Sequence, residues 1–194
     1  MKKTGILVLA IAFVAMSFVK PTPMVVETYK VDSASSTLTW KGYKPTGSHT
    51  GTILLQSGTI EMHDNKIKSG SFVADMSSIK DADGSEKLEG HLKSVDFFEI
   101  EVFPTSKFEV TKTHHIDGKT HVTGNLTIKD ITKEITFEAV VVAKGKTVTL
   151  TSETFQVNRA DYNIKYKSQS FFNDLKEKFI NDEFDLQVTI VAKK

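Results

Sequence analysis

The chain has 194 residues, and its 25 Lys and Arg residues nearly balance its 24 Asp and Glu residues, so the formal net charge at pH 7 is +1. This balance, without any block of basic residues, argues against a nucleic-acid-binding protein. The chain has no cysteine, which excludes disulfides and a thiol nucleophile, so its stability must come from its core. A chain of this length suffices for one domain with a sizeable core.

The first residues have the pattern of an export signal. Lys2 and Lys3 precede an apolar run from Gly5 to Val19, which is typical of a secretory signal peptide. The run is shorter than the roughly twenty residues that span a bilayer, and an uncleaved membrane anchor is the alternative. We therefore expect a cleaved signal peptide over residues 1–19, a folded domain over residues 27–194, and a periplasmic or otherwise exported protein.

From Glu27 onward, apolar and polar residues mostly alternate, which is the pattern of half-buried strands. About eight long strands at regular spacing predict an all-β fold, an extended antiparallel eight-stranded β-barrel with two short helical insertions. Closing the sheet removes the exposed edges that would otherwise aggregate. Strands of about twelve residues reach roughly 40 Å before tilt, so the barrel either fills with side chains or encloses one elongated ligand.

The first helical insertion is predicted where Leu88, His91 and Leu92 are spaced i, i+3, i+4 and share one helical face. Two adjacent phenylalanines, Phe97 and Phe98, follow on a short turn. An apolar helical crossing between long strands suggests a lid or plug for an apolar space.

A second helix is predicted from Ser170 to Ile180, with Ser170 as its cap. Its apolar residues fall within one arc at 100° per residue and would also cover the barrel opening; they are Phe171, Phe172, Leu175 and Phe179.

The most readable hairpin follows Pro104. A three-residue loop with Gly118 in the left-handed conformation places Val110 opposite Gly124 and Phe108 opposite Leu126, which keeps both apolar sets on one face. A two-residue loop would shift this register by one residue. We therefore expect the three-residue loop.

Several segments together resemble the YceI-like family. The run His91–Phe98, followed by Phe103-Pro104, resembles the family's H-L-x-S-x-D-F-F…P signature. The segment Gly124–Lys133 is similar to its G-x-L-T-I-x-x-x-T-K segment, and Asn158–Tyr162 to its N-R-x-D-F/Y segment. The resemblance covers essentially the whole chain after the export signal.

What the resemblance implies is an extended lipocalin-like barrel in the bacterial periplasm that holds a long isoprenoid or similar lipid. The phenylalanine-rich segment from Ser170 to Ile180 departs from the family pattern. It lies where a pocket could be covered, so the ligand expected from the family need not transfer unchanged.

The predicted ligand-facing residues combine inward-facing barrel positions with the two helical insertions, and ordinary core packing is the alternative for the apolar ones. This set is Trp40, Phe72, His91, Leu92, Phe97, Phe98, Phe108, Leu126, Phe137, Phe155, Arg159, Phe171, Phe172, Leu175 and Phe179.

The role of each of three polar residues has two interpretations. His91 either binds a ligand headgroup or ties the helical insertion to a backbone carbonyl. Asp96 is either a first-turn helix residue or a catalytic acid. Arg159 either meets a phosphate or quinone oxygen, which suits its planar fork, or pairs with Asp161 or Asp96.

No metal, cofactor or catalytic motif is expected. His114, His115 and His121 lie near one hairpin tip, but two outward-facing histidines do not make a structural metal site. The chain has no G-x-S-x-G, G-x-G-x-x-G or P-loop pattern.

Three functions remain open. The first is a binding protein that sequesters or carries a polyisoprenoid, isoprenoid quinone or similar lipid. The second is an enzyme that modifies such a lipid, with His91 and Asp96 as an acid–base pair. The third is a dry-cored barrel that binds a partner. The partner expectations are a long-chain lipid ligand and no nucleic acid, with a homodimer and a transient membrane contact left open.

Overall fold

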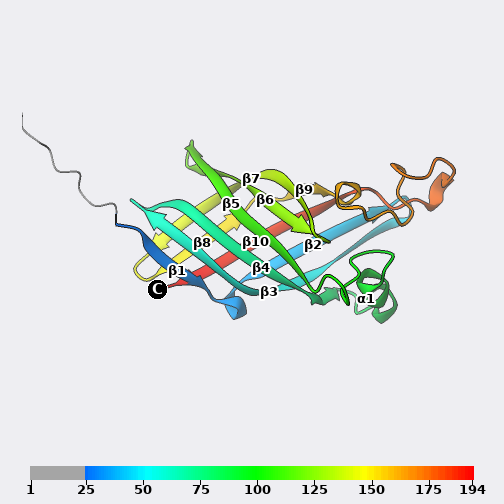
Figure 1. Cartoon of the computed structure of the whole chain (residues 1–194), viewed down its shortest axis with the longest axis horizontal. Helices are drawn as coiled ribbons and strands as arrows, with labels where there is room; N and C mark the ends of the chain where they lie inside the picture. Colours follow the sequence, from blue (N-terminus) through cyan, green and yellow to red (C-terminus); the bar gives the residue numbers. More distant parts are fainter. Residues whose placement is uncertain (1–24) are drawn as a thin grey trace, which may run out of the picture.

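The computed structural model describes residues 25–194, which form an elongated sheet of antiparallel strands with its one α-helix at one end (Figure 1). The strands are β1 (Glu27–Val31), β2 (Thr37–Lys44), β3 (Gly47–His63), β4 (Lys66–Asp81), β5 (Thr105–Ile116), β6 (Lys119–Ile128), β7 (Ile131–Lys144), β8 (Thr147–Ser152), β9 (Phe155–Asn158) and β10 (Glu183–Lys193). The helix is α1 (Glu86–Lys93), and the 3-10 turns are η1 (Ser33–Ser35), η2 (Arg159–Tyr162) and η3 (Lys176–Lys178).

The strands close into a ring because β10 pairs on both of its edges. On one edge it pairs with β2, Leu186 opposite Trp40, and on the other with β8, Ile190 opposite Leu150. Strands β1 and β2 share the place between β10 and β3, and β8 and β9 share the place between β7 and β10. Ten strands therefore occupy eight positions, as the predicted eight-stranded barrel requires.

The end of the barrel near β1 is tightly packed. Ile60, Val122, Ala139 and Val148 are completely buried there, on strands whose inner faces alternate with exposed residues. This alternation is the period of two that was visible in the sequence. The packed end is the opposite end from α1 (Figure 1).

A row of phenylalanine rings crosses the middle of the barrel. The ring centroids of Phe72 and Phe108 lie 6.5 Å apart, those of Phe108 and Phe137 5.5 Å, and those of Phe137 and Phe155 4.5 Å. Offset and tilted rings at such separations attract one another beyond their burial. Phe137 pairs with the completely buried Val122, so the row adjoins the packed end.

The first helical insertion has the predicted form. Ser85 caps α1 by accepting a hydrogen bond from Leu88 N, and Leu92 is buried against the barrel. The following turn is closed by a hydrogen bond from Phe97 N to Ser94 O.

The helix predicted from Ser170 to Ile180 is wrong, because the chain there runs through turns and only the short η3. Asp182 accepts hydrogen bonds from the backbone and hydroxyl of Ser170, and Lys176 has a left-handed backbone with φ 49°. The left-handed residue interrupts any helix that would run through it, and the bonds to Asp182 hold the start of the segment next to the beginning of β10. Phe171 and Phe172 are consequently 42% and 49% exposed.

The register predicted for the β5–β6 hairpin is confirmed: Val110 lies opposite Gly124 and Phe108 opposite Leu126. The predicted three-residue loop is wrong. Ile116 pairs with Lys119 across a two-residue turn, and a bulge between Val110 and Lys112 supplies the extra residue instead. His114, not His115, consequently faces His121 across the strands.

The signal peptide expected over residues 1–19 lies outside the described residues. Within residues 25–194, no helix is both long and apolar enough to cross a membrane.

Gly51 gives a test of the strand packing next to the open end. A Cβ at this position would overlap the carbonyl oxygen of Lys80 and lie 2.6 Å from Trp40 Cζ2. We expect Gly51→Ala to lower the free energy of unfolding by about 1–3 kcal/mol, because the strand and the indole must both shift. Gly42→Ala is the matched control, since a Cβ added there would have no atom within 4 Å, and should change it by less than about 0.5 kcal/mol. Urea unfolding measures both, and equal losses would contradict the close approach.

Candidate functional site

A cavity of about 600 Å³ occupies the end of the barrel that carries α1. Exposed residues in its wall, Lys44, Thr46 and Lys87, show that it reaches the surface. Its wall is mainly apolar, and the residues beyond the predicted set include Tyr43, His49, Ile53, Ile79, Leu88, Ile164, Tyr166, Phe184 and Leu186. A smaller apolar cavity of about 80 Å³ adjoins it. The two share wall residues Ile53, Phe98, Phe184 and Leu186.

Most of the predicted ligand-facing residues line one of the two cavities. Those in the wall of the larger cavity are Trp40, His91, Leu92, Phe97, Phe98, Arg159 and Phe179. Those in the wall of the smaller cavity are Phe72, Phe98, Phe108 and Leu126. Both inserted segments therefore contribute phenylalanines to one space, although only one of them is helical.

Five predicted residues are placed elsewhere. Phe137 and Phe155 stack on each other at 4.5 Å and belong to the packed barrel core. Phe171, Phe172 and Leu175 lie outside both walls, because the turns of residues 168–178 carry the two phenylalanines to the surface.

His91 lies at the cavity wall in an aromatic setting. Its Nε2 is 3.0 Å from Asp96 Oδ2, and its ring meets the rings of Phe97 and Tyr166 edge-on at 5.1 and 4.5 Å. The partner of Nε2 is thus the carboxylate of Asp96, the residue that the enzyme hypothesis paired with His91, and not a backbone carbonyl. The pair with Asp96 fixes the orientation of the imidazole at the cavity wall.

Trp40 lies in the cavity wall and is 8% exposed. Its Nε1 has no hydrogen-bond partner among the described residues. A buried indole N–H usually has one. This N–H is itself buried, so it is the apolar part of the indole that faces the cavity.

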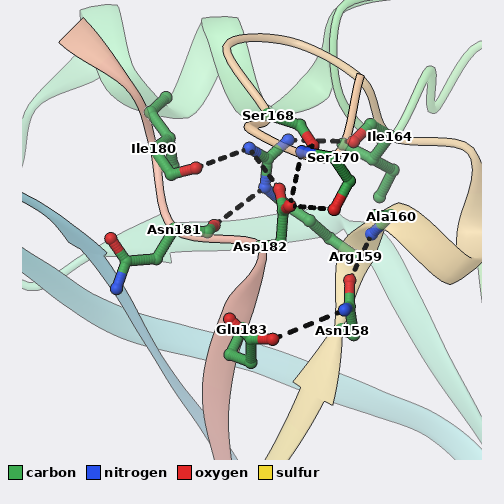
Figure 2. Close-up of polar contacts among 10 residues, drawn as sticks. All are labelled: Asn158, Arg159, Ala160, Ile164, Ser168, Ser170, Ile180, Asn181, Asp182 and Glu183. Atoms are coloured by element: carbon green, nitrogen blue, oxygen red, sulfur yellow. Dashed lines mark hydrogen bonds and ion pairs between the residues drawn. The ribbon is translucent and has the colours of Figure 1, made fainter. Parts of the chain in front are cut away.

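All three guanidinium nitrogens of Arg159 donate hydrogen bonds to backbone carbonyl groups of the protein (Figure 2). Its Nε donates to Asn181 O at 3.0 Å, Nη1 to Ile164 O at 2.9 Å and Nη2 to Ile180 O at 2.9 Å. Nη2 also lies 3.3 Å from Asp182 Oδ1. Both predicted partners, Asp161 and Asp96, are wrong, and the guanidinium instead holds the wall-forming segment 164–182 onto η2.

The ion pair of Arg159 and Asp182 is buried, with side chains 4% and 9% exposed. Burial lowers the pKa of the guanidinium, an effect opposed by the charge of Asp182. Burial raises the pKa of Asp182, but hydrogen bonds from Ser168 and Ser170 and the charge of Arg159 outweigh it, so the pKa lies below its usual value. The stability that Asp182 contributes is therefore present above its unfolded-state pKa and lost as the pH falls through the folded-state value.

The family model described as YceI-like domain matches residues 29–192. The chain belongs to the YceI-like family. A UPF0312 protein of Photorhabdus laumondii is 33% identical over 104 residues, 52% of this chain and 50% of that protein. Protein YceI of Salmonella arizonae is 34% identical over 55 residues, 28% of this chain and 29% of that protein. The matched segments thus span half or less of these curated relatives.

Two solved structures share the fold of this YceI-like chain. BcnA of Burkholderia cenocepacia aligns with a TM-score of 0.69 at 21% identity, over 84% of this chain and 99% of that one. A polyisoprenoid binding domain from Saccharophagus degradans aligns with a TM-score of 0.62 at 13% identity, over 85% and 97% of the two chains. These likenesses confirm the lipocalin-like barrel architecture.

Several wall residues of this YceI-like barrel were not predicted from the sequence. Phe184 and Leu186 share the inward face of β10, so their alternation was a usable signal. Tyr166 and Ile164 lie in irregular chain after η2, where no periodicity marks which side chains point inward.

Arg159→Lys tests the role of the guanidinium. A lysine keeps the charge but replaces three bonded nitrogens with one, which leaves buried carbonyl oxygens unpaired. We expect the free energy of unfolding to fall by about 3 kcal/mol or more. Lys107→Gln is the control, because its pair with Glu109 is about half exposed and should cost below about 1 kcal/mol. Similar losses from both variants in urea unfolding would contradict this role of the guanidinium.

Proposed function

We propose that this YceI-like protein binds one long apolar lipid of the polyisoprenoid type in the barrel. The observation that carries the proposal is the cavity of about 600 Å³, which has a mainly apolar wall and leads toward the smaller apolar cavity. Its volume lies within the range of about 300–1,000 Å³ that ligand pockets occupy. The structural likeness to a polyisoprenoid binding domain supports the same ligand class.

Apolar burial supplies the affinity. Each buried CH₂ contributes about 0.8 kcal/mol, so roughly fifteen such groups give about 12 kcal/mol before the cost of association. That cost is at least about 4 kcal/mol, so at most about 8 kcal/mol remains, which makes micromolar affinity the upper limit for a tail of this size. A longer tail that also reaches the smaller cavity binds more tightly, because it buries further CH₂ groups.

The rim of the cavity favours an anionic or oxygen-rich headgroup. Lys44, Lys87, Lys167 and Lys178 belong to the wall, together with Glu177 as an acidic residue. The lysines attract a phosphate or a similar anion. Arg159 does not take this role in our proposal, because its nitrogens are bonded to backbone carbonyls.

We propose binding and transport as the role, with no chemical change of the lipid. His91 and Asp96 do form the close pair that an acid–base mechanism needs. Mass spectrometry of a polyprenyl phosphate recovered after long incubation with the protein separates these functions. Binding alone returns the lipid unchanged, and a modified product that disappears in His91→Ala identifies an enzyme.

The wall phenylalanines provide the direct test. Phe98 and Phe179 line the larger cavity, whereas Phe137 is 7% exposed and stacked in the core. We expect Phe98→Ala and Phe179→Ala to weaken binding of a long-chain polyprenyl phosphate at least tenfold, with melting of the empty protein little changed. Phe137→Ala should cost about 3–5 kcal/mol of stability and leave affinity nearly intact.

Titration of Trp40 fluorescence measures the affinities, since Trp40 is the single tryptophan and lies in the cavity wall. Equal stability losses in all three variants with unchanged affinity would mean that these phenylalanines are ordinary core.

We also propose that the protein is exported, on the pattern of Lys2 and Lys3 before the apolar run to Val19. N-terminal sequencing of the protein recovered from the cell envelope should give a start between about Ser17 and Glu27. Recovery of chains that begin at Met1 from the cytosol contradicts export.

A further inference from the structure

Three side chains with metal-ligand chemistry converge beside the cavity. His49 on β3, Asp81 at the end of β4 and Asp83 in the following loop each present one ligand atom, and these atoms all lie within 4.8 Å of one another. His49 also belongs to the cavity wall. The cluster thus lies where the strands give way to α1.

The strand register builds this cluster. Gly51 on β3 pairs with Asp81 on β4, and Ala82 N donates to Thr50 O, so the loop after β4 is held against β3. Ser85 N donates to Asp81 Oδ2 at 3.1 Å. That hydrogen bond fixes the carboxylate with its other oxygen, Oδ1, 3.5 Å from His49 Nδ1.

These two facing atoms lack the partners that buried polar atoms normally have. The side chain of Asp81 is 0% exposed. Within residues 25–194, neither Asp81 Oδ1 nor His49 Nδ1 makes a hydrogen bond. A buried carboxylate oxygen without a hydrogen bond or a cation is costly, and such groups are usually paired or coordinate a metal.

We propose that His49, Asp81 and Asp83 form a binding site for a divalent transition-metal ion such as Zn²⁺. One imidazole nitrogen and two carboxylate oxygens are ligands that Zn²⁺ accepts at about 2.0–2.2 Å, whereas Mg²⁺ and Ca²⁺ prefer oxygen alone. In a tetrahedron with bonds of about 2.1 Å, two ligand atoms lie about 3.4 Å apart. The 3.5 Å between Asp81 Oδ1 and His49 Nδ1 matches that spacing.

The hydrogen bond from Ser85 N gives the site a second shell. It orients the Asp81 carboxylate in the way that outer partners orient metal ligands. Three protein ligands leave the fourth position of a zinc site open to water or another oxygen. A bound ion joins β3 to the loop that leads into α1, and so fixes the helical cover of the cavity whether or not a lipid is bound.

The test is calorimetric titration of the chelator-treated, purified protein with Zn²⁺ alone, with a metal count after dialysis. We expect one Zn²⁺ per chain and a higher melting temperature with Zn²⁺ present. His49→Ala and Asp83→Asn should each weaken binding at least tenfold. Neither residue is buried, so both variants should fold. Co²⁺ should give the visible absorption of a tetrahedral site in the wild type and lose it in His49→Ala.

His63→Ala is the matched control. His63 Nδ1 also lies 3.5 Å from a carboxylate oxygen, Asp64 Oδ2, but Asp64 is 84% exposed in a turn. This variant should bind Zn²⁺ as the wild type does. Equal weakening in His63→Ala would indicate adventitious binding by surface histidines, and the absence of stoichiometric binding would mean that His49 and Asp81 meet without a metal ion. Either result overturns the metal site.

Discussion

The pairing of β10 on both edges is the constraint on which the rest of the molecule depends. It turns a long sheet into a ring, so backbone groups that would lie at exposed edges are paired within the chain. The ring also gives every strand an inside and an outside. Side chains of the inner face can then fill one end of the barrel and leave space at the other, and a ligand site arises from how the interior is filled.

The cavity wall formed by segment 164–182 is held in place by the buried ion pair of Arg159 and Asp182. Asn158 at the end of β9 pairs with Glu183 at the start of β10. Because the strands are antiparallel, Arg159, which follows Asn158, then lies beside Asp182, which precedes Glu183. The guanidinium then takes up the carbonyl groups of an otherwise irregular segment (Figure 2). Irregular chain usually lies in water because its backbone groups need partners. One arginine lets this segment form a cavity wall instead.

The sequence predicted the features of the fold that depend on local residue patterns. Alternation identified the strands, and the register of Phe108 and Val110 followed from keeping apolar residues on one face. The face of α1 followed from helical spacing. The segment after Ser170 was predicted wrongly because its apolar spacing is helical, whereas the backbone turns left-handed at Lys176, which no spacing rule reveals. The convergence of His49 on Asp81 likewise depends on cross-strand register, which no motif records.

The phenylalanine row across the middle of the barrel has a consequence for ligand exchange. Because the end near β1 is packed, a lipid bound as we propose enters and leaves at the end that carries α1, its tail first on the way in and last on the way out. For such a lipid, threading from end to end is excluded, and the release rate depends on withdrawing the whole tail past Phe98, which lines both cavities. The row also limits the length of the tail, so the protein would select among homologous lipids by the number of carbons that fit between the opening and the rings.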